Sequence, residues 1–211
     1  MPSSDSSKFF TEDWTVTLPS HPNLRFIRLI PSRYNHLVRI LSNPLNDPNN
    51  RRPDDTSWQD SDSQNLTSIF TKRYLAAKMD HKALSLLVEE DGKMVGIGMI
   101  HELEHQPRVA NIGTILEAEG RGHGVGKVLM ELLLRLSNEL DVDAVEAGTF
   151  KANAAMRGLM RSLGVEETDE EKTMPGNRKV AEILFKDIAR ERWKDLEIGV
   201  EFLGMADGWG G

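Results

Sequence analysis

The hydrophobic positions of the chain predict a mixture of strands and helices. Apolar residues at every second position are typical of a strand, and apolar residues three or four apart are typical of one face of a helix. On this basis, strands are predicted at residues 24–30, 84–89, 93–103, 109–117, 144–150 and 178–187. Helices are predicted at residues 31–41, 64–79, 125–140 and 153–163.

Turn residues support this order of elements. Asp91-Gly92 stands between two predicted strands and is a strong hairpin signal, so the strands on either side are expected to be antiparallel. Gly164 occupies the position that commonly ends a helix. The sequence therefore predicts an α/β fold, and its length fits one domain with additions.

Three segments lack a regular pattern. Residues 1–20 carry Pro and Ser at both ends and are predicted to form a flexible arm. Residues 43–63 hold several Pro, Asn and Asp residues and are predicted to form a polar insertion loop within a domain spanning residues 21–190. Residues 191–211 contain scattered apolar side chains and are predicted to form a tail that packs on this domain.

Composition narrows the class of protein. The net charge of −7 argues against a nucleic-acid partner, because such proteins usually carry a basic face. The chain has no cysteine, which excludes disulfides, thiolate nucleophiles and zinc–thiolate sites, and we predict no metal site. No stretch is apolar over the length of a bilayer, and the polar N-terminus does not read as a signal peptide. We expect a cytoplasmic monomer or homodimer without a membrane partner.

Residues 120–127, between a predicted strand and a predicted helix, read Gly-Arg-Gly-His-Gly-Val-Gly-Lys. Backbone amides without bulky side chains at a helix N-terminus form an anion site, although a glycine-rich turn without a ligand is the alternative. A Walker A loop needs a Ser or Thr where Val128 stands and a Gly where Arg121 stands. A dinucleotide fingerprint needs a third glycine where Val125 or Lys127 stands. Spacing therefore excludes both nucleotide loops.

The segment Arg121–Gly126 does fit the pattern of Arg or Gln, two residues, Gly, one residue, and Gly or Ala. In this it resembles motif A of the GNAT superfamily of acyl-CoA transferases. Residues 112–121 resemble the superfamily's fourth strand running into its turn, and Asn153–Val165 resembles its next block, an Asn-led helix ending in Leu-Gly. Residues 24–29 and 41–44 resemble the branch that acetylates ribosomal-protein N-termini and small amines.

The resemblance covers about residues 24–190. It implies the GNAT fold, a mixed and mostly antiparallel sheet of about six or seven strands with its fourth and fifth strands splayed apart and helices on both faces. It implies acetyl-CoA as the acyl donor and a primary amine, on a small molecule or a protein N-terminus, as the acceptor.

The resemblance also implies which residues bind the donor. They are the backbone groups of Ile115 and Leu116, the turn residues Arg121, Gly122, His123, Gly124, Val125, Gly126 and Lys127, and Asn153. Within this set, Arg121 is expected to add charge and His123 to be a solvent-facing spacer. Asn153 also stands where an N-cap of a helix is expected.

The superfamily's usual acid–base residues have no counterpart. It often places a Glu on the fourth strand and a Tyr in the following helix, and the matching positions here are Ala110 and Met160. We therefore predict Glu102, expected to lie across from Asn111, or Glu146 as the general base. The substitutions leave two alternatives open: an acyl-CoA-binding protein with altered chemistry, and an acyltransferase that uses another acyl group or a hydroxyl acceptor.

Overall fold

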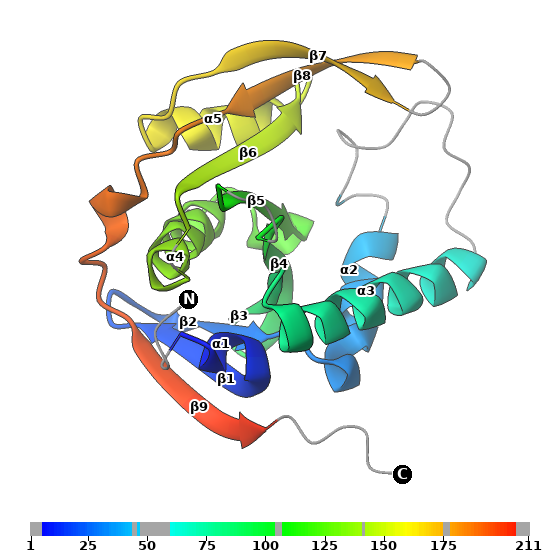
Figure 1. Cartoon of the computed structure of the whole chain (residues 1–211), viewed down its shortest axis with the longest axis vertical. Coiled ribbons are helices and arrows are strands. Elements are labelled where there is room, and N and C mark those ends of the chain that lie inside the picture. Colours follow the sequence, from blue (N-terminus) through cyan, green and yellow to red (C-terminus); the bar gives the residue numbers. More distant parts are fainter. Residues whose placement is uncertain are drawn as a thin grey trace.

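The computed structural model describes residues 6–43, 46, 60–103, 107–140, 142–174 and 178–205. Its strands form one sheet in the order β7-β8-β6-β5-β4-β3-β2-β1-β9 (Figure 1). The strands are β1 (Glu12–Leu18), β2 (His21–Arg28), β3 (Leu84–Glu90), β4 (Lys93–His101), β5 (Val109–Leu116), β6 (Ala144–Phe150), β7 (Thr168–Met174), β8 (Arg178–Phe185) and β9 (Gly199–Met205). The described residues thus form nine strands, against the six or seven predicted.

Strands β1 to β5 follow one another as an antiparallel meander. The turn between β3 and β4 is the predicted hairpin turn at Asp91-Gly92. Both of its residues have positive φ, 48° and 81°, as a tight turn between twisted strands requires. The hairpin prediction is confirmed.

The predicted splay lies between β5 and β6. These two strands are parallel and pair only at Val109–Asn111 with Ala144–Glu146. Beyond that point β5 continues to Leu116, while the rest of β6 pairs with β8 on its other side. The two strands therefore enclose a V whose apex is at Asn111 and Glu146.

Helices cover both faces of the sheet, as predicted. They are α1 (Lys8–Thr11), α2 (Tyr34–Ser42), α3 (Asp60–Asp80), α4 (Val125–Glu139) and α5 (Ala154–Ser162). The apolar faces of α2 and α3 pack in one hydrophobic cluster, and α4 and α5 pack in the other, on the opposite side of the sheet (Figure 1). None of the described helices is both long and apolar enough to cross a membrane.

The flexible arm predicted at residues 1–20 is wrong for the part that the structure describes. Strand β1 lies inside the sheet between β2 and β9, and the side chain of Trp14 is fully buried. The buried guanidinium of Arg28 donates hydrogen bonds to the carbonyls of Phe10 and Glu12. Core packing and buried hydrogen bonds thus fix this segment, which the Ser-rich composition around it concealed.

Parts of the segments without a predicted element form strands or the start of a helix. The described part of the predicted tail 191–211 includes β9, which pairs with β1 and extends the same sheet. Strand β7 forms where no element was predicted, and it lies at the sheet edge, where a polar strand is tolerated. Helix α3 begins inside the predicted loop 43–63, of which residues 44–45 and 47–59 lie outside the described residues.

Candidate functional site

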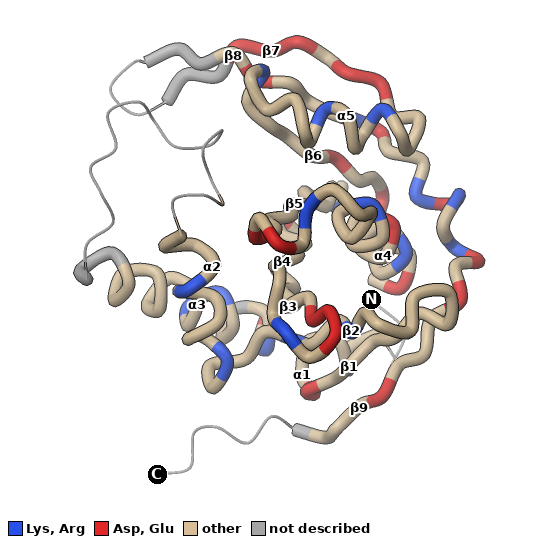
Figure 2. Tube along the Cα trace, turned by 180° about the vertical axis from the view of Figure 1, so that it is seen from behind, with Lys and Arg blue, Asp and Glu red and all other residues tan. Residues whose placement is uncertain are grey.

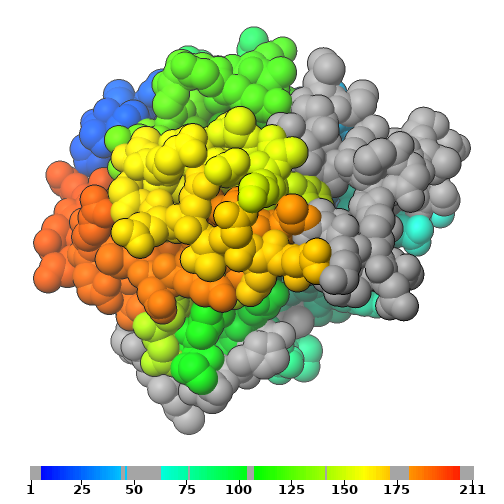
Figure 3. All heavy atoms as spheres, turned by 90° about the horizontal axis from the view of Figure 1, so that it is seen from above, coloured from blue at the N-terminus to red at the C-terminus, as the bar shows by residue number. Residues whose placement is uncertain are grey.

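A groove of about 490 Å³ opens where β5 and β6 diverge. Its walls are Gly113–Leu116 of β5, the glycine-rich turn before α4, Gly148 and Thr149 of β6, and the first part of α5 beginning at Asn153. Figure 3, from above, shows α5 in yellow and the following strands in gold and orange on the surface at this end of the molecule. Because the glycine-rich turn in its wall leads into α4, the groove joins the splayed strands to the N-terminus of that helix.

The groove brings together most of the residues predicted to bind the donor. Ile115, Leu116, Arg121, Gly122, Gly124, Gly126, Lys127 and Asn153 all line it. His123 and Val125 do not, and the Val125 side chain is buried in the core, which leaves only its backbone for a ligand.

The glycine-rich turn has the backbone of an anion site. Gly122 and Gly124 have φ of +87° and +99°, which a residue with a side chain adopts only under strain. Gly124 is the N-cap of α4, and no side chain caps the amides of that first turn. Amides that no side chain caps, together with the positive end of the helix dipole, favour a bound anion there.

Arg121 lies at the junction of the turn and β5. Its Nε and Nη2 donate to the Leu116 carbonyl at 2.9 and 2.7 Å, and Nη2 also donates to the Asn46 carbonyl at 2.8 Å. The guanidinium therefore contributes positive charge to this end of the groove while it fixes the end of β5 to the segment that follows α2.

His123 is 46% exposed but is not a free spacer. Its Nε2 lies 3.0 Å from Glu90 Oε2 on β3, and its Nδ1 lies 3.0 Å from the Arg121 carbonyl oxygen. The hydrogen bond to Glu90, together with the carboxylate charge, raises the pKa of His123. This contact ties the glycine-rich turn to the β3–β4 hairpin.

The ion pair predicts a measurable titration. We expect the imidazole of His123 to titrate above the ordinary value of about 6.5, and the Glu90→Gln variant to return it toward that value. Because the folded-state pKa is raised, the contribution of this pair to stability is complete below the unfolded-state pKa and is lost as pH rises through the folded-state pKa. An NMR titration of the histidine ring protons measures both values. Glu89→Gln is the matched control, since Glu89 pairs with Arg25; an unchanged His123 titration in Glu90→Gln would contradict the assignment.

Asn153 caps α5 in the way its residue type predicts. Its Oδ1 accepts from the Met156 amide at 3.1 Å, and its Nδ2 donates to Thr149 Oγ1 at 2.9 Å. These two contacts fix α5 against β6, and thereby fix one wall of the groove.

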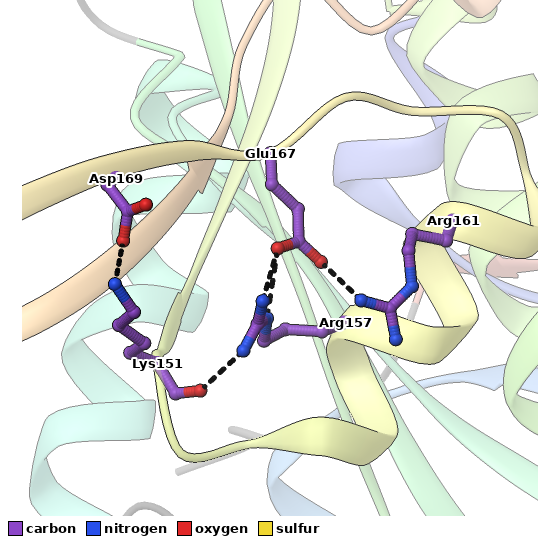
Figure 4. A network of polar contacts seen from close by, with 5 residues as sticks. All are labelled: Lys151, Arg157, Arg161, Glu167 and Asp169. Carbon is purple, nitrogen blue, oxygen red and sulfur yellow. Dashed lines mark hydrogen bonds and ion pairs between the residues drawn. The ribbon is translucent and has the colours of Figure 1, made fainter.

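A charged network holds α5 and the turn before it to the segment 167–169 at the start of β7 (Figure 4). Arg157 donates to Glu167 through Nε and Nη2, at 3.0 and 2.6 Å, and Arg161 donates to the same carboxylate at 3.2 Å. Lys151 pairs with Asp169 at 2.5 Å. The Arg157 guanidinium holds the pKa of the Glu167 carboxyl below its usual range. The network thus joins α5 and the turn before it to the acidic segment at the start of β7, and Figure 2 shows the red β7 above α5 with its blue residues.

Polar side chains share one face of the sheet at the apex of the V. His101 of β4 pairs with Asn111 of β5, which in turn pairs with Glu146 of β6. Directly paired residues present their side chains on the same face, and the next residues along the strands on that face are Gly113 and Gly148, which line the groove. The row His101–Asn111–Glu146 therefore borders the closed end of the groove.

The register corrects the expectation for Glu102. His101 lies across from Asn111, so Glu102 is one residue past this row, at a backbone φ of +67°, with its side chain 49% exposed. Within the described part of the chain, Asn111 and Glu146 make no side-chain hydrogen bond or ion pair. Of the two predicted bases, Glu146 lies on the same face of β6 as the lining residue Gly148, two residues before it, although neither base is itself a lining residue.

Ala110 and Met160 are both completely buried in the core on the α4 side. Neither position faces the row on the other side of the sheet. Sequence reasoning also missed Glu182 of β8, whose Oε1 lies 3.2 Å from where a Cβ on Gly148 would be. Glu182 could be placed beside Gly148 only once the pairing of β6 with β8 was known, because the two residues are distant in the sequence.

Solved structures of similar fold include two amine acetyltransferases. RimL, a ribosomal L7/L12 α-N-protein acetyltransferase in complex with coenzyme A, matches with a TM-score of 0.65 at 13% identity, over 80% of this chain and 96% of its own. Spermidine N-acetyltransferase from Vibrio cholerae, in complex with CoA and spermine, matches with a TM-score of 0.59 at 16% identity, over 80% of this chain and 98% of its own. At these identities the similarity is one of fold.

The sequence comparisons concern the same region as the groove. No curated protein sequence matches this chain significantly. The profile of the acetyltransferase (GNAT) family matches residues 43–165, which is more than half of the chain and includes β5, the glycine-rich turn, α4, β6 and α5. The chain therefore belongs to the acetyltransferase (GNAT) family.

Proposed function

We propose that this protein is an acetyl-CoA-dependent N-acetyltransferase that transfers the acetyl group directly to a primary amine of a small molecule or a protein N-terminus. The observation that carries the proposal is the groove, which runs from the splayed strands to the uncapped amides of α4. A CoA thioester has the two parts that suit such a groove, an amide-bearing pantetheine arm and a pyrophosphate.

The donor would lie along the groove in one direction. Beyond Asn111, the edge of β5 that faces β6 has no strand partner among the described residues, so peptide groups near Ile115 are left for the pantetheine amides. The amides of Gly122 to Lys127 would hold the pyrophosphate, with positive charge from Arg121 and Lys127 nearby. This arrangement directs the thioester toward the apex of the V, where Glu146 lies.

Glu146 is our proposed general base. A primary amine arrives as its ammonium ion near neutral pH, and the carboxylate removes one proton, directly or through water. The neutral nitrogen then attacks the thioester carbon, and a backbone N–H of β5 stabilises the oxyanion. The C–S bond breaks to release CoA thiolate, and the nitrogen gives its second proton to water or to the thiolate, which leaves the neutral amide. Met160 offers no proton at the position where the superfamily often has a Tyr, so the leaving thiolate is not protonated from there.

Charge along β6 favours a cationic acceptor. Glu146 lies at the apex of the V, and Glu182, across from Phe150 on β8, approaches Gly148 farther along β6. A carboxylate pair attracts an ammonium ion in a partly desolvated site. The amine acceptors named for the two enzymes of similar fold support the same class of acceptor.

The test is CoA release in the presence of an amine panel of polyamines, amino-acid amides and peptides. Because the chain has no cysteine, a thiol reagent reports only the CoA thiol that is released. We expect release above the hydrolysis rate with at least one amine. Binding of CoA without release for any amine would favour an acyl-CoA-binding protein with altered chemistry. Release only with longer thioesters or with alcohols would favour an acyltransferase that uses another acyl group or a hydroxyl acceptor.

A further inference from the structure

Asn46 is a buried residue at the edge of the groove that motif comparison did not single out. The residue is 7% exposed, and it lines the groove. Three contacts fix it: its amide donates to the Asn43 carbonyl at 3.0 Å, its Nδ2 donates to the Ile40 carbonyl at 2.9 Å, and its own carbonyl accepts from Arg121. Asn46 is therefore held in place from α2 on one side and from the glycine-rich turn on the other.

One polar atom of Asn46 has no partner among the described residues. Its Oδ1 is shielded from solvent, and no described group donates a hydrogen bond to it. The orientation of the amide is fixed, because exchanging its oxygen and nitrogen would place Oδ1 against the Ile40 carbonyl, where two acceptors would face each other. A buried carbonyl oxygen without a donor is unfavourable, so a ligand that supplies one in the groove is preferred there.

The position of Asn46 indicates which part of a donor would supply that hydrogen. Nη2 of Arg121 contacts both the Asn46 carbonyl and the Leu116 carbonyl at the end of β5, at 2.8 and 2.7 Å. Asn46 thus lies where the strand edge gives way to the anion-binding turn. In a CoA molecule laid along the groove, the segment at this transition is the pantoyl group, which carries a hydroxyl and the neighbouring amide N–H.

We propose that Asn46 Oδ1 accepts a hydrogen bond from the pantoyl hydroxyl or the adjacent amide N–H of the donor, and so sets the position of the pantetheine arm. This inference rests on the proposed acyl-CoA donor. It is independent of which acceptor is used, and of whether the chain turns over. Asn46 is a binding and positioning residue in this account, with no role in proton transfer.

The test compares two ligands on the Asn46→Leu variant by calorimetry. CoA carries the pantoyl group, whereas 3′-phospho-ADP keeps the pyrophosphate and lacks the pantetheine arm. We expect the variant to bind CoA roughly tenfold more weakly, the loss of about one hydrogen bond, and to bind 3′-phospho-ADP within about twofold of the wild type. Equal weakening of both ligands would mean that Asn46 acts only by supporting Arg121, and unchanged CoA binding would also overturn the proposal.

Two further samples keep the result interpretable. Asn138→Leu is the matched control, because the Asn138 amide also donates to backbone carbonyls, of Leu134 and Arg190, but lies outside the groove. Its CoA affinity should not change. If Asn46→Leu does not fold, Asn46→Ser is measured in its place with the same expected contrast. A wild-type protein that binds no CoA would refute the donor itself, which is a different outcome from a missing contrast between the ligands.

Discussion

The Glu146→Gln variant is expected to lower kcat by about 10²- to 10⁴-fold, the usual contribution of a positioned general base, and to leave the affinity for CoA within about twofold. Glutamine keeps the size of the side chain and its place beside the groove, but it cannot take the proton from the acceptor ammonium. The measurement is steady-state CoA release with the best amine, together with calorimetry of CoA binding.

The pH profile separates loss of the base from structural damage. The variant needs no base once the free amine is abundant, so its rate should recover toward that of the wild type as pH approaches the acceptor pKa, about 10.4 for a lysine-like amine. A structural defect would not recover in this way. Recovery therefore assigns the lost step to proton removal.

Glu102→Gln is the matched control for this experiment. Glu102 is the other carboxylate predicted from the sequence, and its side chain is 49% exposed one residue past the row at the apex. It should retain nearly full activity. Full activity in Glu146→Gln, with loss in Glu102→Gln, would contradict the assignment that the register supports.

Local sequence signals were sufficient for the parts of the fold whose residues interact with near neighbours. The Asp91-Gly92 turn and the apolar stripe of α4 are encoded within a few residues, and both formed as predicted. Strand β1 was missed because it is fixed between two strands of the sheet, and one of them, β9, is distant in the sequence. A local pattern does not report such a distant partner. Strand β7 was missed because an edge strand has little apolar surface to bury, and its sequence is correspondingly polar.

The site divides in the same way. The glycine-rich turn could be identified because its conformation requires glycine, so the residue types themselves report the backbone. The row at the apex depends on strand register, and a slip of one residue exchanges the face that a side chain occupies. The sequence predicted Glu102 opposite Asn111, whereas the structure places His101 there, a shift of one residue. Asn46 and Glu182 carry no local signal, since each is placed beside the groove by contacts with segments distant in the sequence.

Replacing Gly124 by Val is expected to weaken CoA binding about 100-fold. Gly124 has a φ of +99° at the N-cap of α4, and a β-branched residue there is strained by about 1–3 kcal/mol, so the turn is expected to relax and its amides to move out of alignment. Calorimetry with CoA measures the affinity, and chemical denaturation measures the free energy of unfolding.

Gly204→Val is the control that separates loss of the anion site from the effect of backbone strain alone. Gly204 has a φ of +83° on the edge strand β9, and a Cβ there meets no atom within 4 Å. This variant carries comparable backbone strain away from the groove, so its free energy of unfolding should fall by a similar amount while its affinity for CoA stays unchanged. If Gly124→Val bound CoA as well as Gly204→Val does, the backbone of the turn would not be what holds the pyrophosphate, and the donor would have to lie elsewhere along the groove.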